Sequence, residues 1–280
     1  MPLRPRPDGD LCRDLPPVRR IMPYLMRGRN ESAVYHETLW DISRTRRWLK
    51  AYNRAHAQHA TLFHLFTYTC ARGLHARPGL NRFVASGRIY QRREVSISFA
   101  AKPEMTDTAP FVTVKVVFPA DEPFEAAVRR IVQGIEMACS GPKRQVDVEV
   151  ATVMKLPGAL VRVLVGLERL LDGWNLLPGA LTRDDPMYAS LFLANLGSVG
   201  LSDTWHHLYE YGTVSLFGAL SMPRRSAFVE GDQVVVKEGL QVRWTFDERV
   251  NDAHYCAASL RVAQDIVEDP ERHVGAAEAV

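Results

Sequence analysis

A strand that turns directly into a helix near the carboxyl terminus is the feature that most constrains this fold. The apolar run from Val242 to Phe246 is typical of a strand, and a helical pattern follows it over about Asp252 to Ile266. The turn between them, from Thr245 to His254, carries acidic, basic and imidazole side chains. This junction indicates an α/β protein with a candidate functional site in the turn.

The rest of the chain alternates strands and helices. The segment from Thr61 to Leu74 is apolar around most of its circumference, so we expect this helix to lie in the centre of the core. Strands are predicted at Phe111 to Phe118 and at Val146 to Val150, on either side of a helix over Pro123 to Ala138. No internal repeat or linker divides this pattern, which therefore predicts a single domain.

Two other segments of the second half have specific predictions. The runs Gln233 to Lys237 and Leu240 to Phe246 predict a hairpin that turns at Glu238-Gly239. The segment from Leu156 to Leu181 predicts a surface helix with a wide apolar face. We interpret this helix as a cover for the sheet or a subunit contact, and the alternative is a lid that meets lipid or acyl chains.

The two ends of the chain differ from its body. Residues 1–18 are rich in proline and arginine, which predicts a flexible arm or an arm that wraps across a neighbouring subunit. Residues 19–271 are assigned to the domain, and residues 272–280 are expected to form a mobile tail.

Composition excludes several classes of function. The formal net charge is only +3, and no basic-aromatic platform is visible, so we expect no nucleic-acid binding. The four cysteines are widely spaced, which indicates mostly buried thiols in a reducing compartment. No apolar run is long enough to cross a membrane, and the amino terminus lacks a secretory signal, so we expect a cytoplasmic protein.

Three short motifs carry a family resemblance. They are Pro78-Gly79-Leu80-Asn81 after the early buried helix, Asn195-Leu196-Gly197 after a strand, and Asp247-Glu248-Arg249-Val250-Asn251-Asp252-Ala253 before the last helix. In this order, the motifs resemble the catalytic domain of 2-oxo acid dehydrogenase acyltransferases, from about Arg19 to Glu271. The resemblance implies a two-layer α/β sandwich, with a mixed β-sheet backed by helices, like chloramphenicol acetyltransferase. It also implies a homotrimer with active sites between subunits, and it leaves open whether trimers assemble further.

The catalytic positions of that family are altered in this chain. In the family, a histidine removes the proton from the thiol of coenzyme A or a dihydrolipoyl arm, and a serine donates a hydrogen bond to the oxyanion. Carried over by position, the histidine corresponds to Glu248 and the serine to Ala194, whereas Asp252 matches the family aspartate. A carboxylate with a pKa of roughly 4.3 is a poor base for a thiol with a pKa of roughly 8.5, and alanine donates no hydrogen bond.

The chemistry could have moved to nearby residues. His206 and His207 follow the Asn-Leu-Gly turn and are candidates for a replacement base, with Glu248 or Asp252 orienting an imidazole. Ser198, Asn195 or a backbone N–H of the glycine turn could then face the oxyanion. The structural alternative is that one histidine packs against Trp205 or Tyr209 while the other is solvated.

The other charged residues of the turn are predicted to have structural roles. We expect Asp247 and Arg249 to form a structural ion pair, because a strand end with both signs requires them to be satisfied. No metal site is predicted, since the adjacent histidines are not a recognised ligand spacing. No covalently bound cofactor is predicted either, and coenzyme A or acyl-CoA would be a substrate.

Two hypotheses of function remain from the sequence. The first is an acyltransferase-like enzyme that moves an acyl group to or from a coenzyme A-type thiol. The second is a catalytically inactive trimeric scaffold, cage component or binding platform. The chain shows no lipoyl domain, so we do not expect full membership of a dehydrogenase complex.

Overall fold

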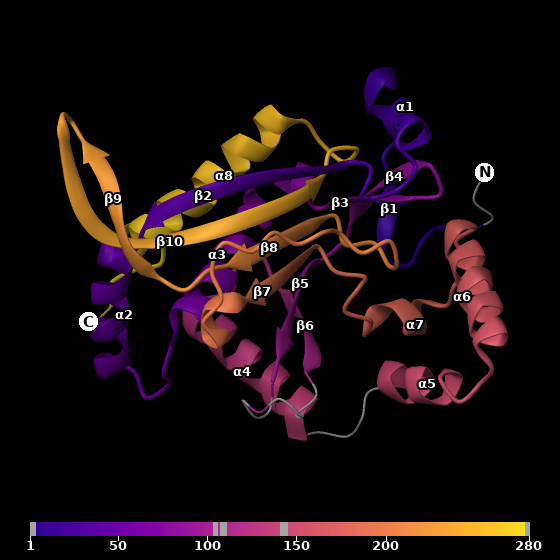
Figure 1. Cartoon of the computed structure of the whole chain (residues 1–280), viewed down its shortest axis with the longest axis horizontal. Helices are drawn as coiled ribbons and strands as arrows, with labels where there is room; N and C mark the ends of the chain where they lie inside the picture. Colours follow the sequence, from indigo (N-terminus) through magenta and orange to yellow (C-terminus); the bar gives the residue numbers. More distant parts are fainter. Residues whose placement is uncertain (1–3, 103–105, 107–110, 141–144, 278–280) are drawn as a thin grey trace.

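A mixed seven-stranded sheet is the centre of the computed structural model, which describes residues 4–102, 106, 111–140 and 145–277 (Figure 1). The strand order is β2-β10-β8-β7-β5-β6, and β9 pairs with the outer part of β10. The strand β7 pairs in parallel with both β5 and β8, whereas the other pairs are antiparallel. The bounds are β2 Ala33–Asp41, β5 Val95–Ala101, β6 Val112–Phe118, β7 Leu191–Asn195, β8 Leu216–Leu220, β9 Arg224–Glu230 and β10 Gln233–Asp247.

Four helices pack against this sheet around one large core. Alternate residues of the strands, such as Ile97, Phe99 and Trp244, join apolar residues of the helices in a single buried cluster. This alternation is expected of strands with one face on the core. The predicted two-layer α/β sandwich, with a mixed sheet backed by helices, is confirmed. The helices are α2 Ser43–Ala55, α3 Leu62–Ala76, α4 Phe124–Ser140 and α8 Ala253–Glu268.

The central helix α3 is confirmed where the sequence predicts it. Its residues Leu65 and Phe66 have no exposed surface, and α3 contacts α4, α8 and the strand β5. A capping box closes its first turn: the backbone N–H of His64 donates to the Thr61 hydroxyl, and the backbone N–H of Thr61 donates to Nδ1 of His64.

The imidazole of His64 should make stability depend on pH. Burial lowers the pKa of His64 to about 4, below the value of roughly 6.5 expected in the unfolded chain. Between these two pH values the unfolded state binds the proton and the folded state does not. The contribution of His64 to the free energy of unfolding is therefore complete above pH ~6.5 and is lost as the pH falls toward 4, at up to about 1.4 kcal/mol per pH unit. We expect His64→Gln, which keeps an acceptor at the capping position, to reduce this slope in denaturant unfolding measured from pH 7 to 4. An unchanged slope would assign the acid sensitivity to other groups.

Two predicted elements differ from the structure. The segment predicted as a strand at Val146 to Val150 lies in the helix α5 Gln145–Val153, where Val148 and Val150 are exposed. A short valine-rich run has the same composition in either element, so periodicity could not separate them.

The predicted hairpin turn at Glu238-Gly239 is also wrong. These residues lie inside the continuous strand β10, and the hairpin instead joins β9 to β10 at Gly231, which has a φ of 60°. Gly239 does not form a turn but allows neighbouring side chains to pack closely against the strand. A Cβ at this position would lie 2.8 Å from both Leu39 Cδ1 and Ser226 Oγ.

The amino-terminal arm packs on its own chain. The strand β1 Gly9–Leu11 pairs with β4 Arg88–Arg92, which also pairs with β3 Arg82–Ala85, and α1 Pro17–Leu25 follows it. The sequence predicted a flexible arm or an arm that wraps across a neighbouring subunit. Packing of the arm on its own chain was not among these two alternatives. The carboxyl-terminal segment also makes contacts, because Trp48 Nε1 donates to the Gly275 carbonyl and Ala277 is buried. The short helix α9 Pro270–His273 comes shortly before Gly275 and Ala277 in the chain and follows α8.

The apolar helix from the middle of the chain does not cover the sheet. In Figure 1, α6 Gly158–Gly173 stands with α5 beside the sheet, away from the β9–β10 hairpin. Its side chains Val163, Leu167 and Leu170 are exposed. The cover interpretation is therefore wrong for this chain, and the subunit contact and the lid remain predictions. The short helix α7 Gly179–Arg183 leads from α6 back toward β7.

Candidate functional site

The turn after β10 is held by a buried ion pair. Arg249 Nε donates to Asp247 Oδ1 at 2.8 Å, and Arg249 Nη2 donates to Asp247 Oδ2 at 2.7 Å. The hydroxyl of Ser32 also donates to Asp247, while Arg249 Nη1 donates to the carbonyls of Met26 and Arg27. The predicted structural ion pair is confirmed, and it fixes the path of the turn.

The two other carboxylates of the turn have different environments. Asp252 begins α8 and accepts a hydrogen bond from the backbone N–H of Tyr255 at 2.8 Å, so it acts as the N-cap. Arg19 Nη2 lies 4.0 Å from Asp252. Glu248 is half-buried, and its backbone carbonyl accepts from Arg19 Nη1 at 2.7 Å. Within the part of the chain that the structure describes, the Glu248 side chain has no hydrogen-bond partner.

The glycine turn lies at the opposite end of the sheet from Glu248. Ala194 pairs with Ala219, and Ala219 pairs with Arg243 of β10. From Arg243 the strand runs four residues to Asp247, which is about 13 Å at strand spacing. Within one chain, Ala194 and Glu248 are therefore too far apart to act on the same atoms.

The predicted oxyanion donors occupy the glycine turn. The short helix η2 Leu196–Val199 follows Asn195, and the exposed Ser198 hydroxyl donates to the Asn195 carbonyl at 2.7 Å. Asn195 is half-buried at the end of β7. The Ser198 proton is therefore already used in a local hydrogen bond.

His206 and His207 lie on the face of the sheet that the four core helices do not cover. The His206 ring stacks on Phe217 with a centroid distance of 3.9 Å, and the Thr245 hydroxyl donates to the His206 carbonyl. Each Nδ1 lies within hydrogen-bond distance of the next backbone carbonyl, at 2.7 Å for His206 and 2.8 Å for His207. A carbonyl only accepts, so this arrangement fixes the proton on Nδ1 and leaves Nε2 as the basic nitrogen of the neutral ring.

The two imidazoles differ in exposure. Burial lowers the pKa of His206, which favours the neutral imidazole, whereas His207 is exposed. Among the residues that the structure describes, neither ring contacts Glu248 or Asp252. The predicted orienting carboxylates do not reach the predicted bases within one chain.

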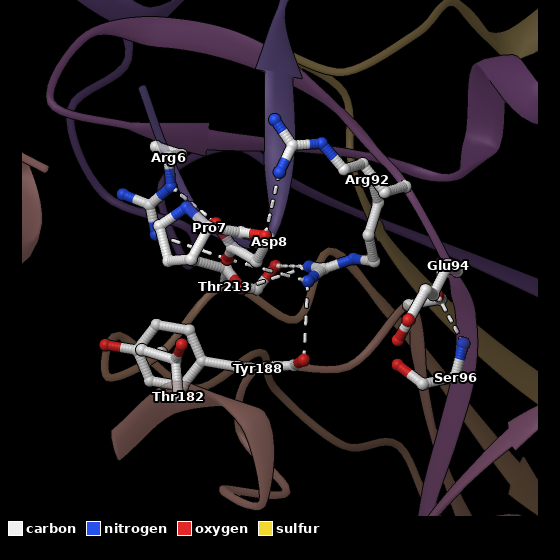
Figure 2. Close-up of polar contacts among 12 residues, drawn as sticks. Arg6, Pro7, Asp8, Arg92, Glu94, Ser96, Thr182, Tyr188 and Thr213 are labelled. Atoms are coloured by element: carbon white, nitrogen blue, oxygen red, sulfur yellow. Dashed lines mark hydrogen bonds and ion pairs between the residues drawn. The ribbon is translucent and has the colours of Figure 1, made fainter. Parts of the chain in front are cut away.

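A second buried charge network was not predicted from the sequence. Figure 2 shows Arg92 directed at Asp8 of the arm, at Tyr188 and at Thr213. Arg92 is buried, which lowers its pKa to about 10, and Arg6 binds both Asp8 and Asp172. Arg6 and Asp172 are separated by 166 residues, so no local pattern could have indicated this contact.

Metal binding and membrane insertion have no structural support in the described part of the chain. No group of three histidine, cysteine, aspartate or glutamate side chains lies close enough to hold a metal ion there. Over the same residues, no helix combines the length and the hydropathy needed for a membrane span.

Solved structures with the same fold identify the class of architecture. A probable dihydrolipoamide acetyltransferase from Listeria monocytogenes matches with a TM-score of 0.62 and 13% identity, over 95% of this chain and 96% of that chain. The cubic core of a pyruvate dehydrogenase multienzyme complex matches with a TM-score of 0.60 and 15% identity, over 91% of this chain and 88% of that chain. A chloramphenicol acetyltransferase matches with a TM-score of 0.51 and 14% identity, over 90% of this chain and 94% of that chain.

This chain therefore has the fold of the chloramphenicol acetyltransferase-like acyltransferases, as the sequence motifs predicted. No family profile and no curated protein sequence matches it.

Proposed function

We propose that this chain is a non-catalytic protein built on the acyltransferase fold, which assembles with further copies into a scaffold or binding platform. The proposal is carried by the turn from Asp247 to Asp252. Its structural parts are complete, since the ion pair is buried and Asp252 caps the last helix. The catalytic side chains are replaced, because Glu248 in this turn and Ala194 at the end of β7 occupy the positions that the family resemblance gives to the base and the oxyanion donor.

The exposed apolar surface supports assembly. The edge strand β2 exposes Tyr35 and Leu39, and the β9–β10 hairpin, which projects from the body in Figure 1, exposes Val229, Val234 and Val236. Apolar side chains that gather on an unpaired edge and a projecting hairpin are typical of subunit interfaces. One neighbour in fold is itself the cubic core of a multienzyme complex.

Native mass spectrometry tests the assembly. We expect particles of three chains or a multiple of three, and we expect Val234→Asp combined with Val236→Asp to dissociate them, because two carboxylates would be buried without partners. Val18→Asp, an equally exposed position on α1, is the matched control and should leave assembly unchanged. A monomeric parent protein would contradict the proposal.

Acyl transfer by a relocated base is the second candidate. It is favoured by one observation, the fixed Nδ1–H tautomer of His206 and His207, which leaves a basic Nε2 on each ring. In an assembled protein, a neighbouring copy would have to supply the oxyanion donor and the carboxylate. Coenzyme A or acyl-CoA would then be the thiol-linked substrate.

Two measurements separate these candidates. A ligand that binds only the folded state raises the melting temperature, so a shift with millimolar coenzyme A favours the enzyme. If acyl exchange between coenzyme A and a small dithiol is detectable, His207→Ala should abolish it while the assembly stays intact. Absence of both the shift and the exchange supports the scaffold.

A further inference from the structure

The arm and the small three-stranded sheet enclose a cleft that the proposed function does not use. The cleft has a volume of about 850 Å³, within the range of small-molecule sites. Its walls come from the arm up to Arg13, from α1 and from the start of β4. Pairing of β1 with β4 fixes the arm as one wall, and Asn175 at the base donates to the Arg4 carbonyl.

The lining is strongly cationic. Five arginines face the cleft, against one acidic residue, Asp10; they are Arg4, Arg6, Arg13, Arg20 and Arg88. Arg6 is neutralised by Asp8 and Asp172, and Asp10 is bound bidentately by Arg93, which does not line the cleft. Asp10 is therefore not available to balance the other guanidinium groups.

The remaining four arginines have no counter-charge within the described chain. The side chains of Arg4, Arg13, Arg20 and Arg88 make no hydrogen bond or ion pair with any residue that the structure describes. Asp14 lies next to Arg13 in sequence but does not line the cleft. Four unpaired positive charges around one cleft repel each other, and a bound anion with several oxygens would relieve this repulsion.

We infer that this cleft binds a small molecule that carries two or more phosphoryl groups. Guanidinium groups bind phosphoryl oxygens bidentately, and four of them match a diphosphate or triphosphate better than a single carboxylate. The apolar parts of the wall, which include Leu11 and Ile89, would accommodate an organic group attached to the phosphates. The inference does not depend on the proposed function, since the cleft is separate from both the Asp247 turn and the histidine pair.

Isothermal titration calorimetry of the full chain at low ionic strength tests the inference, with inorganic pyrophosphate and ATP as probes. We expect both to bind. Arg13→Gln combined with Arg88→Gln should weaken binding by roughly tenfold or more, because each lost charge-assisted hydrogen bond weakens it separately. The matched control is Arg54→Gln combined with Arg261→Gln, which removes the same charge at two exposed positions outside the cleft. Melting curves of both variants verify that they fold.

Each outcome decides the inference. Binding that falls only in the cleft variant supports it, and tighter binding of ATP than of pyrophosphate identifies the nucleoside phosphate as the preferred form. Failure of the parent protein to bind either probe overturns it, as does an equal loss in the two variants, which indicates a general effect of net charge. A single-stranded RNA that binds more tightly than ATP and competes for the same arginines also overturns it, in favour of a nucleic-acid surface.

Discussion

Replacing Asp247 with alanine is expected to lower the free energy of unfolding by about 3–5 kcal/mol, a large fraction of the stability of a typical domain. The guanidinium of Arg249 is almost fully buried, and two of its nitrogens bind the Asp247 carboxylate. The variant would leave that charge buried without its partner. Urea unfolding followed by circular dichroism measures the change.

Asp252→Ala is the control for this prediction. The two residues are carboxylates of the same turn, but Asp252 is exposed: it caps α8 and lies 4.0 Å from Arg19 Nη2, so we expect a loss of about 1 kcal/mol. Replacing both partners of the buried pair, as Asp247→Ala with Arg249→Met, should destabilise less than Asp247→Ala alone, because no unpaired charge remains. Equal losses for Asp247→Ala and Asp252→Ala would show that the ion pair does not hold the turn.

Rebuilding the two altered positions is expected to create acyl-transfer activity. A base contributes about 10² to 10⁴ in rate and an oxyanion donor about 10² to 10³, so Ala194→Ser combined with Glu248→His should exceed the parent by about 10⁴ or more. Each single variant should remain far below the double variant, since both groups act in one transition state. The measurement is acyl exchange between acetyl-coenzyme A and dihydrolipoamide.

The rebuilt variant also tests the assembly. Ala194 and Glu248 lie at opposite ends of the sheet within one chain, so any gain requires that neighbouring copies bring them together. The control is the double variant combined with Val234→Asp and Val236→Asp, which should lose the gain as it dissociates. An assembled double variant with no activity would mean that this chain lacks further parts of the catalytic site.

The candidate site was predicted only in its local part. The ion pair of Asp247 and Arg249 could be predicted, because two opposite charges at a strand end lie two residues apart. The distance between His206 and Glu248 could not be predicted. A long loop places the His206 imidazole on Phe217, and the position of a loop depends on the side chains that it contacts.

The sequence alone determined the elements whose side chains repeat with a clear period. The apolar circumference of α3 and the helical spacing of α4 gave their positions, because burial against a sheet requires that periodicity. Only the tertiary structure decided that the arm pairs with β4, that Val146 to Val150 is helical, and that Arg6 reaches Asp172. Periodicity in the sequence indicates which residues are buried. The partner of a buried charge depends on contacts between distant segments, and these contacts form only when the whole chain is folded.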